Sequence, residues 1–187
     1  MRAPLAVAIV GVAVLAAAIL VETAPSDAQE QHGAFPVALT EGERGDGRNL
    51  AVRVADPRLA DVVVLDGWRG TTTGEWLVLD ATAAARSSDA LLVTTLRIGE
   101  LSFAGLDSGE ADTLESTLLE PGLPWRGALL FELPADAAAL PGADHATLRA
   151  ALSSDPRLDS VLELEIDLTT LPHDAQVLVP SLERTTW

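Results

Sequence analysis

The segment from Val161 to Leu168 has the sequence VLELEIDL and alternates apolar with acidic side chains. A period of two residues is the spacing of a β-strand, because successive side chains point to opposite faces of a sheet. The alternation therefore predicts a strand with one buried and one solvated face. The residues expected to face the core are Leu162, Leu164, Ile166 and Leu168.

The same period recurs along the chain before this segment. Turn-forming residues, such as Asp66-Gly67 and the run from Gly70 to Gly74, separate the alternating stretches. Helical spacing is weak and predicts at most one turn, between Ala135 and Leu140. We therefore expect an all-β fold, an antiparallel β-sandwich of seven to nine strands. The other expected strands lie within residues 50–55, 62–65, 77–83, 92–98, 101–103, 129–133 and 148–152.

The N-terminal region has a different pattern, since residues 5–21 carry no polar side chain. The nineteen residues 3–21 would form a helix about 28 Å long, close to the hydrocarbon thickness of a bilayer. Arg2 precedes the run and Glu22 follows it, and the positive flank places the N-terminus in the cytoplasm. We expect residues 1–21 to form a single-pass transmembrane anchor in the plasma membrane, with the rest of the chain outside.

A cleaved signal peptide is the alternative interpretation of this segment. Residues 26–28, Ser-Asp-Ala, have the small-x-small pattern of a cleavage site, and cleavage after Ala28 would give a secreted protein that begins at Gln29. We expect the anchor to be retained, because the apolar run is longer than in most cleaved signals. Residues 22–35 then form a polar linker, and residues 36–187 form the extracytoplasmic domain.

Composition excludes several classes of function. The 187 residues include 12 Arg, no Lys and 28 Asp plus Glu, giving a net charge of −16, which argues against binding to nucleic acid. Without Cys, neither a disulfide nor a Cys-ligated metal site can form. The segment Gly105–Gly109 misses the serine nucleophile elbow by one position, and zinc-ligand spacings and phosphate loops are missing. We therefore expect no catalytic, cofactor-binding or metal-binding residues.

Two groups of residues are candidates for a surface that contacts a partner. Trp68 and Arg69 follow a turn, where a large aromatic ring beside a cation could contact another protein. Glu163, Glu165 and Asp167 lie on one face of their strand, and neighbouring acids are about 7 Å apart by the strand rise. That acidic face could meet a basic partner, although a simply solvated face is the ordinary role of such residues.

The position of a residue in the alternation predicts which face of the sheet it occupies. This rule gives an expectation for Trp125 but not for Trp76. Trp125 begins the stretch that contains Phe131 and shares its parity, so we expect it in the core. Trp76 has the parity opposite to that of Leu77, and the sequence leaves open which face it occupies. Trp187 has no role that the sequence indicates.

Several of these segments resemble one known family. The stretches Gly74–Thr82, Leu96–Phe103, Leu119–Gly122 and Gly127–Pro134 are similar to immunoglobulin-like extracellular domains of Gram-positive bacteria, over about residues 48–168. These domains are grouped with the immunoprotective extracellular antigens and with the domain-of-unknown-function family numbered 4352. The resemblance implies an immunoglobulin-like sandwich of the membrane-anchored actinobacterial type. It supplies no catalytic residues, and the chain lacks the lipoprotein cysteine of many relatives.

The expected function is that of a membrane-anchored, non-catalytic binding or accessory module of the cell envelope, whose partner is another envelope protein. A secreted surface antigen without a specific ligand is one alternative. Another is an extracellular hydrolase, which would need two carboxylates in a deep pocket with their pKa values pushed apart. Asp107, Glu110 and Asp112 share one loop and could collect oxygens around calcium, but their spacing fits no standard loop.

Overall fold

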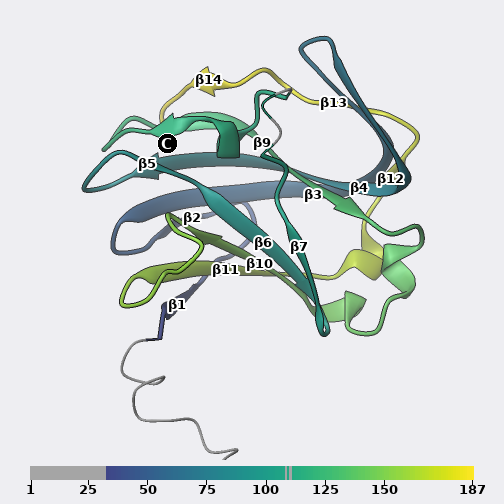
Figure 1. Cartoon of the computed structure of the whole chain (residues 1–187), viewed down its shortest axis with the longest axis horizontal. Coiled ribbons are helices and arrows are strands. Elements are labelled where there is room, and N and C mark those ends of the chain that lie inside the picture. Colours follow the sequence, from purple (N-terminus) through teal and green to yellow (C-terminus); the bar gives the residue numbers. More distant parts are fainter. Residues whose placement is uncertain (1–32, 108, 110) are drawn as a thin grey trace, which may run out of the picture. The chain divides into compact units, whose positions relative to one another are not determined.

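The alternating segments form two β-sheets that pack face to face in the computed structural model (Figure 1). The structure describes residues 33–187 except 108 and 110. The predicted anchor and its cleavage site therefore lie outside the described residues. Among the residues described, no helix is long and apolar enough to span a membrane.

The smaller sheet has five strands, and the segment from which the fold was predicted forms one of its inner strands, β11. Its order is β1-β11-β10-β6-β7, with bounds Phe35–Ala38, Ser160–Ile166, Ala146–Ala151, Val93–Ile98 and Leu101–Ala104. All neighbours are antiparallel except β1 and β11, which run parallel. The strand predicted within residues 148–152 is thus confirmed as β10.

The larger sheet is built on two long strands, β3 (Leu50–Leu65) and β4 (Trp68–Ala85), with β9 (Trp125–Leu133) beside β4. Short strands extend both edges: β2 (Arg44–Asp46), β12 (His173–Asp174) and β13 (Val177–Leu178) pair with β3, and β14 (Glu183–Arg184) pairs with β9. A separate two-stranded sheet joins β5 (Ala90–Leu91) to β8 (Leu118–Leu119).

The main core fills the space between the two large sheets, and it confirms the predicted parities. Leu77 and Leu79 of β4 and Phe131 of β9 are fully buried there. From the smaller sheet, the predicted set Leu162, Leu164, Ile166 and Leu168 belongs to the same cluster. Trp125 packs against this cluster with part of its surface exposed, as its parity predicted.

A second apolar cluster covers part of the opposite face of the larger sheet. Trp76 and Val78 of β4 and Leu130 of β9 alternate with core residues and therefore point away from the main core. Val177 and Val179, from the segment around β13, pack with them. This cover settles the position of Trp76, which is 3% exposed on the outer face of its sheet.

Several details of the sequence prediction were wrong. The stretches 50–55 and 62–65 form a single strand, β3, because two register shifts bend it between Ala55 and Arg58 and between Ala60 and Val62. Residues 70–74 lie inside β4 and do not form a turn. The described chain has fourteen strands rather than seven to nine, and three pairings are parallel, because short edge strands without a hydrophobic pattern add to both sheets.

Helical structure is limited to single 3₁₀ turns within the described part of the chain. The turn predicted between Ala135 and Leu140 is confirmed as η2. The bounds of the four turns are η1, Leu114–Ser116; η2, Ala137–Ala139; η3, Ala143–His145; and η4, Leu168–Thr170.

Candidate functional site

The two groups of predicted partner residues lie on opposite outer faces of the sandwich. Trp68 packs against the second cluster, on the larger sheet, and its ring meets that of Trp76 edge to face at a centroid distance of 5.9 Å. Arg69 is exposed and donates a hydrogen bond to Gln176 Oε1 at 3.1 Å. Trp68 is thus only half exposed, because it covers its own sheet.

The predicted acidic residues lie on the outer face of the smaller sheet or just beyond its edge. Arg149 Nε donates a hydrogen bond to Glu163 Oε1 at 3.0 Å, and both side chains are half-buried. His145 Nδ1 lies 3.2 Å from Glu165 Oε1, and this contact raises the pKa of His145. Asp167 accepts hydrogen bonds from Thr169, which lower its pKa. The face therefore contains basic groups as well as acids.

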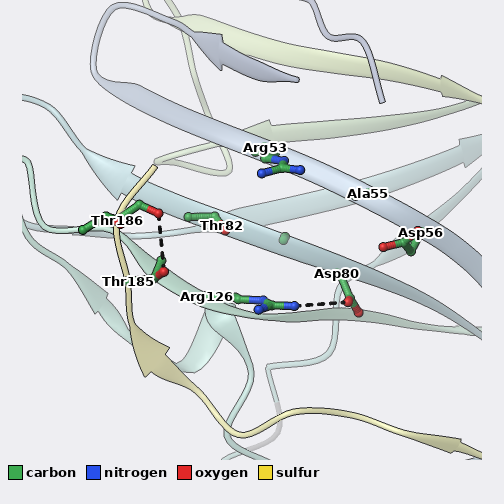
Figure 2. Close-up of a pocket in the computed structure, with 9 residues that line it drawn as sticks. Arg53, Ala55, Asp56, Asp80, Thr82, Arg126, Thr185 and Thr186 are labelled. Atoms are coloured by element: carbon green, nitrogen blue, oxygen red, sulfur yellow. Dashed lines mark hydrogen bonds and ion pairs between the residues drawn. The ribbon is translucent and has the colours of Figure 1, made fainter. Parts of the chain in front are cut away.

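A groove on the outer face of the larger sheet is the candidate binding site (Figure 2). It has a volume of about 330 Å³ and lies beyond the edge of the second apolar cluster. Arg53 of β3 and Arg126 of β9 flank the central strand β4, and Figure 2 shows Thr82 between them. The groove is lined by Arg53, Ala55, Asp56, Asp80, Ala81, Thr82, Arg126, Thr185 and Thr186.

Ion pairs fix one side of the groove. Asp80 Oδ1 accepts a hydrogen bond from Arg58 at 3.1 Å, and Asp80 Oδ2 lies 3.9 Å from Arg126 Nη2. Asp80 is mostly buried, so these interactions are stronger than ion pairs in open water. Arg53 is exposed, and no side-chain hydrogen bond or ion pair involves it among the described residues. The groove therefore presents cationic donors on a chain whose net charge is −16.

A buried carboxyl group lies elsewhere, in the 3₁₀ turn η1. Glu115 is 4% exposed, and its Oε1 accepts hydrogen bonds from Thr94 N at 2.9 Å and Thr94 Oγ1 at 2.8 Å. The pKa of Glu115 is raised to about 7, chiefly by burial and to a smaller extent by the charge of Asp107, while the bonds from Thr94 oppose the shift. Glu115 does not line the groove.

The other charged contacts tie loops to the sheets. Glu75 is buried and accepts a hydrogen bond from Ala137 N at 2.6 Å, which holds η2 against β4. Its Oε2 lies 3.3 Å from His173 Nε2, which is 3.5 Å from Asp61 Oδ1. In the loop whose acids could collect oxygens around calcium, Asp107 and Asp112 are exposed, and Glu110 lies outside the described residues. Among described residues, no three His, Asp or Glu side chains form a metal-binding group.

The groove was not predicted from the sequence, because the residues that line the groove come from three strands and a distant segment. Arg53 alternates with the core residues Val52 and Val54, so its outward direction followed from the sequence. The pairing of β3, β4 and β9 was not readable from the sequence, and it is this register that brings Arg53 and Arg126 to one groove.

The comparisons with known proteins concern the fold. No family model and no curated protein sequence matches the chain. The chain is similar to a solved structure of MPT63, a secreted protein from Mycobacterium tuberculosis, with 16% identity and a TM-score of 0.50 over 72% of this chain and 100% of that chain. An uncharacterized β-sandwich protein from Clostridium difficile is 8% identical, with a TM-score of 0.49 over 76% of this chain and 99% of that chain. The likeness to MPT63 concerns the fold, which in this chain is a β-sandwich.

Proposed function

We propose that this chain is a non-catalytic binding module that acts outside the cytoplasmic membrane and presents the groove at Arg53 and Arg126 to a ligand or partner. The observation that carries the proposal is the contrast between the two halves of one sheet face. The apolar half is covered by the segment around β13, whereas the polar half is open and holds two arginines together with Asp56 and Asp80. Polar groups that converge on a hollow can fix the orientation of a bound ligand.

The location outside the membrane is supported by the sequence and by one neighbour. The apolar residues 5–21 between Arg2 and Glu22 favour an anchor whose C-terminal side is extracytoplasmic. MPT63, which has a similar fold, is a secreted protein. A retained anchor and an immunoglobulin-like assignment of the sandwich are parts of this proposal, and secretion after cleavage at Ala28 is the alternative to the retained anchor.

Binding is favoured over carboxylate catalysis by the way Asp80, one of the two aspartates of the groove, is held. Asp80 is engaged by Arg58 and Arg126, an arrangement that positions the two guanidinium groups. General acid–base catalysis needs a proton-carrying group that faces the substrate. Glu115, whose pKa burial raises to about 7, is enclosed in a different region of the chain.

The experiment tests on which side of the cytoplasmic membrane the domain lies, using the full chain expressed in a bacterial host. We expect the folded domain to be cut by protease added to intact cells, and the protein to stay in the membrane pellet after a carbonate wash. The control carries Val12→Arg and Leu15→Arg, since each arginine near the centre of a membrane helix costs about 3 kcal/mol of insertion free energy. This variant should remain inside and be protected.

The outcomes separate the three possible locations. If the protein is missing from the washed membranes and is found in the medium with an N-terminus at Gln29, the anchor is cleaved and the protein is secreted. Protection of the unaltered chain from protease, equal to that of the double arginine variant, would overturn the extracytoplasmic location.

A further inference from the structure

The groove lies over a row of residues that are side-by-side neighbours across four strands. Arg44 of β2 is opposite Arg53 of β3, which is opposite Thr82 of β4, which is opposite Arg126 of β9. Residues opposite each other in an antiparallel sheet project from the same face. Because strands are about 4.8 Å apart, the backbones of Arg53 and Arg126 are separated by about 10 Å. Two long arginine side chains can therefore converge on a group bound above Thr82.

Two like charges are neighbours in this row, and their repulsion is compensated at only one of them. Like charges directly opposite each other destabilise a sheet, and Arg44 and Arg53 form such a pair. Arg44 is compensated, since its Nη2 lies 2.7 Å from Asp46 Oδ1 and its guanidinium lies 4.3 Å from the ring centroid of Trp187. Two aspartates, Asp56 and Asp80, line the same groove, but Asp80 pairs with Arg58 and Arg126, and no ion pair joins Arg53 to either aspartate in the described residues. An anion in the groove would give Arg53 a direct partner.

Neutral hydrogen-bonding groups complete the walls of the groove. Thr82 lies on its floor, and Thr185 and Thr186, which follow β14, lie at one side, as Figure 2 shows. Hydroxyl groups donate to an oxyanion and adapt their direction by rotation. The volume of about 330 Å³ is large enough for an anion together with a small organic group.

The geometry points to a phosphate group as the ligand of this groove, free or as a monoester of a small molecule. Phosphate carries a charge of about −1.5 to −2 at pH 7 and accepts hydrogen bonds at oxygens that point in several directions. Arg53 and Arg126 lie on opposite sides of Thr82, so each can donate to different oxygens of a tetrahedral oxyanion, whereas a carboxylate has only two oxygens, both in one plane. This inference rests on the groove as the binding site of the proposed function, and it does not depend on where the domain is located.

The test is a calorimetric titration of the full chain, kept in mild detergent at low and fixed ionic strength. The probes are inorganic phosphate and glucose 6-phosphate, with glucose and acetate for comparison. We expect saturable binding of both phosphate probes and weaker or undetectable binding of glucose and acetate. Arg53→Gln and Arg126→Gln should each lower the affinity about tenfold or more, since each removes charge-assisted hydrogen bonds.

The matched control is Arg97→Gln, because Arg97 is exposed on the outer face of the smaller sheet and makes no ion pair with the described residues. Its affinity for phosphate should stay unchanged. If Arg126→Gln fails to fold, Arg53→Gln is the deciding variant. The Arg53 side chain makes no hydrogen bond or ion pair with the described residues, so its replacement should leave the melting temperature unchanged or higher.

Three results would overturn the inference: no saturable binding of either phosphate probe up to about 10 mM, equal affinity in the unaltered chain and in Arg53→Gln, or acetate binding as tight as that of phosphate. Because the titration does not report location, its failure leaves the extracytoplasmic proposal standing. A domain found inside the cell would likewise leave the titration valid.

Discussion

Replacement of Glu115 by glutamine is predicted to remove a loss of stability that the protein suffers as the pH rises toward neutrality. The Glu115 side chain is 4% exposed, and its Oε2 is buried without a hydrogen-bond partner among the described residues. Ionisation therefore places a negative charge where one oxygen has no donor, beside the charge of Asp107. Burial is the largest cause, and it raises the pKa of Glu115 from 4.5 to about 7.

The sign follows from proton binding in the two states. Between pH 4.5 and about 7, the folded protein keeps the Glu115 proton and the unfolded chain has lost it, so the free energy of unfolding falls as the pH rises. Each pH unit of this interval is worth about 1.4 kcal/mol, so the full loss is up to about 3 kcal/mol and is complete above pH 7. Stability from this group is highest below pH 4.5, where both states are protonated.

Glutamine stays neutral, and its Oε1 can accept the same two hydrogen bonds from Thr94. The glutamine amide group also changes the free energy of unfolding by an amount that does not depend on pH. Urea unfolding of the full chain at several pH values between about 5 and 8 measures the free energy of unfolding, and the difference between Glu115→Gln and the unaltered chain should grow by about 2 to 3 kcal/mol across that range. The control is Glu100→Gln, at an exposed turn. A difference that is the same at both ends of the range would refute the reasoning.

Three further changes test the packing and the outer faces. Phe131→Ala should lower the free energy of unfolding by about 3 to 5 kcal/mol, since the ring is fully buried in the main core; thermal unfolding measures it. Gly105→Ala should cost about 1 to 3 kcal/mol in the same assay, because the new methyl group would overlap the bound carboxyl of Glu115. The pair Glu163→Gln and Glu165→Gln should change stability by about 1 kcal/mol or less, and loss of folding would show that these acids support the sheet.

Much of the sandwich was predictable because one buried face imposes a period of two on the sequence. The core residues Leu162 and Leu164, Leu77 and Leu79, and Phe131 were all identified by parity. The short strands were not, since β12, β13 and β14 have only two residues each and their pairing depends on where the ends of β3 and β9 lie. A two-residue strand is too short to show an alternation.

The second cluster and the groove could not be predicted for a different physical reason. Trp76 and Val78 are apolar at outward positions, which the sequence shows, but their cover comes from Val177 and Val179, about one hundred residues later. Arg53 and Arg126 are also far apart in sequence, and they become neighbours of Thr82 only through the register of two strand pairs. Long-range register is fixed by the whole set of packed strands, so no local window of sequence contains it.

The division of the outer face also explains the course of the C-terminal segment. After Val179 completes the apolar cover, the chain pairs with β9 at β14 and then passes the groove at Thr185 and Thr186, before the Trp187 ring packs on Arg44. An apolar cover over the whole face would bury the guanidinium groups of Arg53 and Arg126, and burial of an unpaired charge costs several kcal/mol. The polar segment that crosses here instead supplies hydroxyl groups and leaves the cations solvated. The same sheet face thus has a sealed half that stabilises the fold and an open half whose charges remain available to a ligand.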